Sequence, residues 1–151
     1  MGIFEKIGIG SSSEHLLEGL SDIAGKYQAV AERMSRHAEQ CNYPAMKIAL
    51  ERLAAKEAEH AKALADFLAQ HHRWARLVEL QTREGSNNWE RITGDFTILA
   101  EASGELGHQA THWNVHDPDI GERFQAIVGE DTAIVAELRK LALRADPQAL
   151  D

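Results

Sequence analysis

The stretch from Asn42 to Leu68, NYPAMKIALERLAAKEAEHAKALADFL, decides the fold. After its first three residues, apolar side chains recur at alternating steps of three and four, which is the spacing of one face of an α-helix. Pro44 suits the first turn of a helix, where no backbone N–H is needed. The stripe consists of Met46, Leu50, Leu53, Glu57, His60, Leu64, Phe67 and His71. The stretch predicts a long amphipathic helix with two polar residues in the middle of its inner face.

Three other segments carry stripes with the same spacing. They are Leu16, Leu20, Ile23, Tyr27, Val30, Met34, His37 and Cys41; then Ile92, Phe96, Leu99, Ser103, Leu106, Ala110 and Trp113; and then Ile120, Phe124, Ile127, Asp131, Ile134, Leu138, Leu141 and Ala145. The chain is therefore predicted to be all-α, with four long helices.

The boundaries between these helices set their pairing. Ser11 and Glu14 form a capping-box pattern that predicts the first helix start, and Asp117-Pro118 predicts the start of the last helix. The first and last connections are short, so we expect two antiparallel helix pairs joined by a long crossover over residues 72–88. We expect one domain over residues 1–151, with a leader over 1–11. Trp74, Leu77, Val78 and Leu80 predict a short packed helix inside the crossover.

Composition excludes several classes of protein. Sixteen Lys and Arg against 24 Asp and Glu give a net charge of −8, which argues against a nucleic-acid partner. The single cysteine excludes an intramolecular disulfide and a CxxC metal site. No apolar run approaches the roughly 20 residues of a membrane span, and no nucleotide-binding glycine motif indicates an organic cofactor. We therefore expect a cytoplasmic protein without a membrane partner.

Polar residues interrupt the apolar stripes at one level. Glu57 lies about 14 residues past the first turn and Asp131 about 14 past the last, so each lies roughly 21 Å from its own turn. By the same counting, Tyr27 and Ser103 face this level. Buried carboxylates and imidazoles must be paired or must hold a metal ion. The five residues Tyr27, Glu57, His60, Ser103 and Asp131 are predicted to converge.

The second helix resembles that of rubrerythrin-like and other ferritin-like proteins. The resemblance rests on Glu57-Ala-Glu-His60, an E-x-x-H on the inner face after a short turn, and on two helix pairs joined by a crossover. Members of this family hold two metal ions with one Glu from each of helices 1 and 3 and an E-x-x-H from each of helices 2 and 4. The resemblance implies a ferritin-like four-helix bundle with an iron-binding or redox role.

The full ligand set of that family is absent from this chain. In the segment ERFQAIVGEDTAIVAELRKL, Asp131 falls at the Glu position of the fourth helix and Ile134 at the His position. The Glu positions of the first and third helices fall near Ala24 and Ala100. The resemblance therefore implies Glu57, His60 and Asp131 as ligands for iron or another divalent metal.

The histidines outside the central group are predicted to have other roles. Glu101, Glu105, His108 and His112 lie opposite the inner stripe of the third helix, facing solvent or a partner subunit. His108 and His112, four residues apart, could share a metal ion, although a solvated face is the favoured interpretation. Glu101 or Glu105 would be the missing ligand only if this helix were rotated. His37 is predicted to bond a turn carbonyl beside a packed Cys41.

Three interpretations of the central residues stay open: a metal-free hydrogen-bonded network, a site for a single ion, and a two-metal site. The last would need further ligands from residues whose predicted positions are wrong. The corresponding functions are an iron-binding redox protein or a metal-free helical scaffold. A homodimer is expected in either case.

Overall fold

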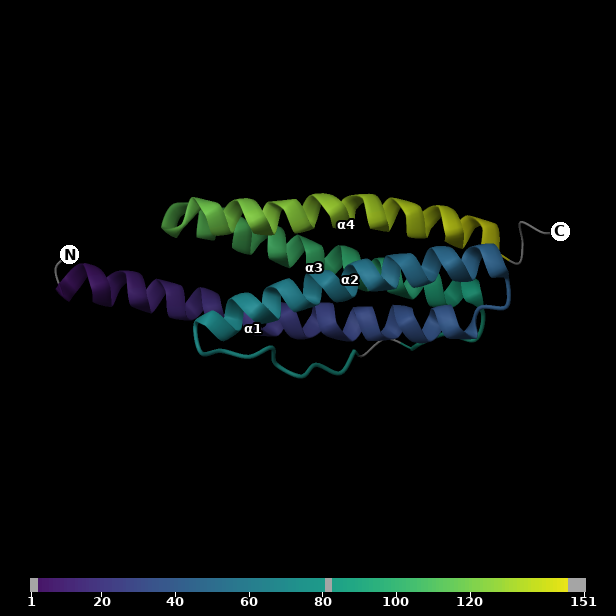
Figure 1. Cartoon of the computed structure of the whole chain (residues 1–151), viewed down its shortest axis with the longest axis horizontal. Helices are drawn as coiled ribbons and strands as arrows, with labels where there is room; N and C mark the ends of the chain where they lie inside the picture. Colours follow the sequence, from purple (N-terminus) through teal and green to yellow (C-terminus); the bar gives the residue numbers. More distant parts are fainter. Residues whose placement is uncertain (1–2, 81–82, 147–151) are drawn as a thin grey trace.

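The computed structural model describes residues 3–80 and 83–146, with side chains from residue 13 onward. Four helices make up the bundle: α1 (Ile3–Gln40), α2 (Pro44–Gln70), α3 (Asn88–His116) and α4 (Pro118–Ala145). Figure 1 shows α2 returning along α1, and α4 returning along α3. The crossover between α2 and α3 runs the length of the bundle, so α3 is antiparallel to α1. The predicted all-α fold of two antiparallel pairs is confirmed.

The helix starts inside the bundle are fixed by local chemistry. Pro44 occupies the first turn of α2 and Pro118 the first turn of α4. The Asn87 side chain accepts a hydrogen bond from the Glu90 backbone N–H at 2.8 Å, which caps α3. Asp117 caps α4 by accepting from the Asp119 N–H at 3.2 Å. The start of α4 at Asp117-Pro118 is the one that the sequence predicts.

The apolar stripes form one continuous core. Most stripe positions are buried. Leu16, Phe96 and Ile120 pack against the core from its margin, and His71 at the end of α2 is exposed. The described buried polar and charged residues are Ser21, Arg33, His37, Glu57, His60, Asp95, Ser103, Gln109 and Asp131. Because burying such groups is costly unless they are paired, these residues are where function is to be sought.

The crossover contains no helix in its described residues, so the short helix predicted there is wrong. Residues 73–80 are irregular, and Trp74 and Leu77 are 76% and 93% exposed. The 27 residues of α2 span about 40 Å, and 17 extended residues at about 3.3 Å each cover that distance easily. The Arg76 backbone N–H donates to the Ser21 carbonyl of α1 and not to a carbonyl of its own segment.

The crossover lies against α1 at Gly25. The Arg76 backbone N–H donates to the Ser21 carbonyl at 2.9 Å. A Cβ added at Gly25 would lie 1.8 Å from the Arg76 carbonyl oxygen. Glycine is therefore needed here so that the two backbones can approach each other.

The first helix starts earlier than predicted. α1 begins at Ile3 and passes through Ser11 and Glu14, so the capping-box pattern does not mark its start. Residues 3–11 of the expected leader belong to the helix, and residues 1–2 lie outside the described residues. Gly and Ser in this segment cost helix stability without forbidding the conformation, whereas a proline would have ended it.

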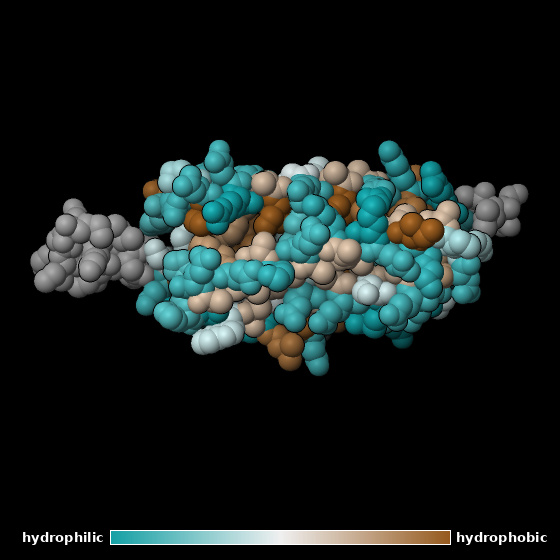
Figure 2. Space-filling model, viewed as in Figure 1, coloured by the Kyte–Doolittle hydropathy of each residue, from teal (hydrophilic) through white to brown (hydrophobic). Residues whose placement is uncertain are grey.

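The face of the molecule in Figure 2 is mostly hydrophilic, with hydrophobic residues in small separate patches. A paler band follows the junction of α1 and α2, where alanines gather. Within the described residues, no helix has a stretch apolar enough to cross a membrane.

Candidate metal centre

Five polar side chains meet at the middle of the bundle, which we call the central cluster. Glu57 and His60 from α2 and Asp131 from α4 each offer a ligand atom within 4.8 Å of the others. The Tyr27 hydroxyl of α1 donates to Asp131 Oδ2 at 2.6 Å, and Ser103 of α3 hydrogen-bonds that hydroxyl. The predicted convergence of these five residues is confirmed, and every helix contributes one or two of them.

The imidazole of His60 contacts three carboxylates. Its Nε2 lies 2.5 Å from Glu130 Oε2. Its Nδ1 lies 3.2 Å from Glu57 Oε1 and 3.0 Å from Asp131 Oδ1. Nδ1 carries at most one hydrogen, so it cannot donate to both oxygens. The aligned hydrogen bond goes to Glu57, and Asp131 Oδ1 is left without a hydrogen-bond partner despite its short distance.

Burial sets the protonation of the cluster when no metal is bound. Burial, and then the neighbouring Asp131, raise the pKa of Glu57 to about 8, although the hydrogen bond from His60 opposes this. Burial by itself would lower the pKa of His60, but its interactions with the carboxylates of Asp131, Glu57 and Glu130 prevail and raise it to about 10. At neutral pH the cluster therefore holds an imidazolium and a protonated Glu57. Burial and Asp131 also raise the pKa of Tyr27, so its hydroxyl remains a donor.

Two buried oxygens in this cluster lack a hydrogen-bond partner among the described residues: Glu57 Oε2 and Asp131 Oδ1. An unsatisfied buried acceptor costs on the order of 1–3 kcal/mol, more when it is charged. Both oxygens belong to carboxylates beside the same imidazole nitrogen, Nδ1 of His60. Without metal, the proton that Glu57 retains serves the hydrogen bond between the Glu57 and Asp131 carboxyl groups, and a bound cation would take the place of that proton.

The spacing of these atoms fits a divalent ion. Two ligands about 2.1 Å from an ion are about 3.0 Å apart at a right angle and about 3.4 Å apart at the tetrahedral angle. The distances from His60 Nδ1 to Asp131 Oδ1 and Glu57 Oε1 are 3.0 and 3.2 Å. Among the described residues, this is the one group of three such side chains close enough to share an ion.

The remaining positions of the implied two-metal site supply no metal ligand. Ala24 and Ile134 are buried and apolar. Ala100 is exposed, so the inner position of α3 at this level belongs to Ser103 instead. Glu101 is also exposed, so α3 is not rotated from the predicted orientation. The geometry fits one ion and does not provide ligands for a second.

A groove between α2 and α4 leads toward the cluster. It has a volume of about 560 Å³, and its lining includes Leu53, Lys56, Glu130 and Ile134. Glu130 also contacts His60, so one residue joins the groove to the centre. Sequence reasoning missed Glu130, because it lies at the edge of the α4 stripe and its side chain is half exposed.

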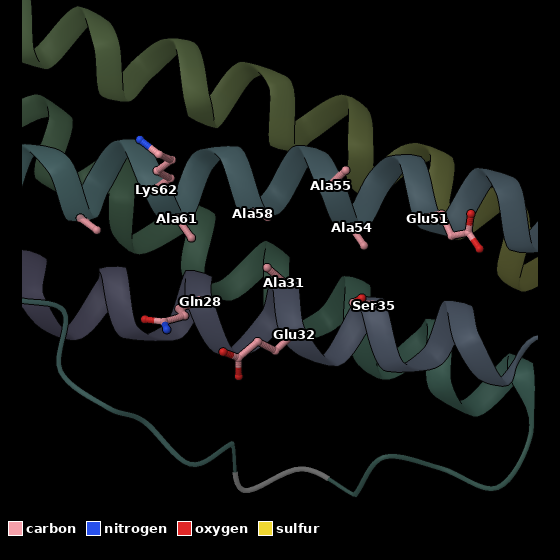
Figure 3. A pocket seen from close by; sticks show the side chains of 11 residues that line it. Gln28, Ala31, Glu32, Ser35, Glu51, Ala54, Ala55, Ala58, Ala61 and Lys62 are labelled. Atoms are coloured by element: carbon pink, nitrogen blue, oxygen red, sulfur yellow. The ribbon is translucent and has the colours of Figure 1, made fainter.

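A second groove, of about 600 Å³, lies between α1 and α2 and touches no member of the cluster. In Figure 3, Ala54 and Ala61 point from α2 toward α1. The side chains on this wall are small, and the chemistry of the central cluster is not accessible from it.

A second buried ionic group was also missed. Asp95 of α3 accepts from Arg33 Nε at 3.0 Å and contacts His37 Nδ1 at 2.7 Å. Arg33 Nη2 also donates to the Arg83 carbonyl of the crossover at 2.8 Å. The predicted bond from His37 to a turn carbonyl is therefore wrong, since a carboxylate holds this ring. Burial raises the pKa of Asp95, and His37 and Arg33 partly offset that rise.

The outward residues of α3, Glu101, Glu105, His108 and His112, lie where they were predicted. Glu105 pairs with Lys26 at 2.6 Å, and His108 and His112 are exposed with their Nε2 atoms 3.3 Å apart.

No protein-family model matches the chain, and no curated protein matches it. What the central cluster can do is therefore argued from its own atoms: one imidazole and two carboxylates, buried at mid-bundle and reached through Glu130.

Proposed function

We propose that this protein binds one divalent metal ion, ferrous iron, at Glu57, His60 and Asp131, and serves an iron-binding redox role related to that of ferritin-like bundles. The observation that carries the proposal is the convergence of three buried ligand side chains, Glu57, His60 and Asp131, whose ligand atoms lie within 4.8 Å of one another. Either a cation or a proton must occupy such a site, and a cation satisfies all three groups together.

The donor set favours a metal of intermediate hardness. Two carboxylates and one imidazole suit iron, manganese or zinc, and the absence of a nearby thiolate disfavours soft ions. Three protein ligands leave coordination positions for water or a small oxidant, and ferrous iron with open positions supplies electrons to dioxygen or peroxide. The groove between α2 and α4 admits molecules of that size.

The surrounding residues hold the ligands in place. Glu130 accepts the Nε2 hydrogen of His60, so the lone pair of Nδ1 is directed toward Glu57 and Asp131 once the imidazolium loses its proton. Tyr27 donates to Asp131 Oδ2, which leaves Oδ1 free on the side of the imidazole. Binding must displace one proton from His60 and one from Glu57, so affinity rises with pH.

Metal titration tests the proposal. Protein freed of metal with a chelator is titrated with ferrous iron under anaerobic conditions, and with manganese and zinc in parallel. We expect one ion per chain at the centre, and loss of that ion in Glu57→Gln, His60→Leu and Asp131→Asn. Glu101→Gln is the matched control, because Glu101 is exposed, on the outward face of α3. No iron above background in the parent chain, with thermal stability unchanged by iron, would overturn the proposal.

The competing prediction is a metal-free scaffold that acts as a homodimer. His60→Leu distinguishes the two, because replacing a purely structural buried ionic group with a hydrophobe is often neutral or stabilising. A scaffold would tolerate this substitution and show no metal-dependent stability. A metal protein would lose both its iron and the stabilisation that iron provides.

A further inference from the structure

We infer that His108 and His112 form a second metal site, a two-histidine zinc chelate on the outward face of α3. The residues are four apart on one helix, so their side chains leave the same face. Their Nε2 atoms lie 3.3 Å apart, with the ring centroids 4.8 Å apart and the rings nearly perpendicular. Both side chains are exposed, so an ion can reach them directly.

The distance between the nitrogens identifies the geometry that the pair fits. Zinc–nitrogen bonds of about 2.05 Å at the tetrahedral angle place two nitrogens about 3.3 Å apart, whereas a right angle would place them about 2.9 Å apart. The observed 3.3 Å therefore matches tetrahedral zinc better than a square-planar ion. Without a metal, the same contact requires one ring to donate to the other, so one proton must be shared between two acceptors.

The hollow beside the pair is lined by two acidic residues, Glu18 and Asp22, and by one basic residue, Arg76, which pairs with Asp22 at 2.9 Å. The two histidines line a hollow of about 460 Å³ whose opposite wall is formed by α1, including His15 and Glu18. Water fills the coordination positions that the two imidazoles leave. This site shares no residue with the central cluster, so the two can be emptied separately.

The test uses the full chain carrying His60→Leu, which removes the central site, and measures zinc binding by calorimetry at neutral pH. We expect one zinc per chain, lost when His108→Ala and His112→Ala are added. His116→Ala is the matched control, because His116 also lies four residues from His112 but makes its ring contact with Trp113. Zinc should remain bound in that control. Circular dichroism checks that all of these variants keep their helix content.

The result has separate consequences for the two sites. If the His60→Leu chain binds no zinc with a Kd below about 1 mM, or binds it equally well without His108 and His112, the second site is disproved. If the parent chain binds no iron but keeps one zinc that depends on the histidine pair, the central proposal fails and the second site stands. An Asp131→Asn background repeats the measurement if the His60→Leu chain does not fold.

Discussion

One imidazole at the centre of the bundle is shared by three acids. His60 contacts Glu57 and Asp131 through Nδ1 and Glu130 through Nε2. In the absence of metal, the hydrogen bond from His60 holds the pKa of the Glu130 carboxyl below its usual value. The cluster therefore exchanges protons for a cation, and the same three acids serve both states.

The metal-free protein should lose stability as the pH rises. Folding raises the pKa of Glu57 from 4.5 to about 8 and that of His60 from 6.5 to about 10. Each group binds its proton more tightly in the folded state, so each stabilising contribution is complete below the unfolded pKa and is lost as the pH passes the folded pKa. In EDTA, the melting temperature should fall between pH 6 and pH 9.

Glu57→Gln serves as the comparison for this measurement. The substitution removes the proton equilibrium with the lower pKa, so the fall should begin later, above about pH 6.5, where His60 alone responds. A melting temperature that is constant or rises from pH 6 to pH 9 in the unsubstituted chain would contradict the assigned protonation.

Glu130 should affect metal affinity without being a ligand. Glu130→Gln keeps an oxygen that accepts from His60 Nε2 but removes the negative charge that makes the imidazole a stronger donor to metal. Residues in this role typically contribute about tenfold to a hundredfold in affinity. We expect iron to bind about tenfold more weakly, measured by anaerobic titration. Glu59→Gln changes a residue that lines the same groove, and this variant should bind iron as the parent does. Equal affinities for the two variants would show that Glu130 does not contribute to metal binding.

At the scale of elements, the contact between the crossover and α1 leaves no room for a side chain at Gly25. In Gly25→Ala, the new Cβ would lie 1.8 Å from the Arg76 carbonyl oxygen, so the crossover backbone must shift. Overpacking of this kind costs about 1–3 kcal/mol, more than the gain in helix propensity from alanine. Gly104→Ala is the matched control, since nothing lies within 4 Å of its added Cβ. Urea denaturation should show Gly25→Ala destabilised and Gly104→Ala neutral or stabilised; equal effects would contradict the close approach.

Helix positions could be predicted because each depends on local sequence. The stripes have the helical period, and Pro44, Asn87 and Asp117 act within a single turn. The conformation of the crossover could not be predicted, because apolar residues such as Leu77 suggest packing, whereas the Arg76 backbone N–H bonds the Ser21 carbonyl of α1. That contact exists only in the assembled bundle.

The central cluster was predictable for a related reason. Counting residues from each turn places Glu57 and Asp131 at the same level, and the short turns fix the helix registers. The pairing of Arg33 with Asp95 could not be predicted, because it joins α1 to α3 across the crossover, where no short turn sets the register. Glu130 lies outside the apolar stripe, and only its long side chain brings it to His60.

In the whole molecule, the two sides of the bundle are held differently. α1 packs closely against both α2 and α3, and α3 packs closely against α4. Asp95, bound by Arg33 and His37, adds a buried ionic connection between α1 and α3. By contrast, α2 and α4 approach each other at few points, and a groove separates them. The central cluster lies at this weakly packed side and supplies a buried polar connection there, beside the exposed pairs Arg52–Glu137 and Lys56–Glu130.

A bound ion should therefore cross-link α2 to α4. Glu57 and His60 belong to one helix and Asp131 to the other, so an ion held by all three resists their separation. Ferrous iron at a hundred times its Kd should stabilise the fold by about 2.7 kcal/mol. Under native conditions, where local opening dominates exchange, amide hydrogen exchange should slow most in the middle of α2 and α4 and least along α1 and α3. In Asp131→Asn, which lacks the ligand from α4, iron should leave amide exchange unchanged. Equal slowing in all four helices of the parent chain would contradict this arrangement.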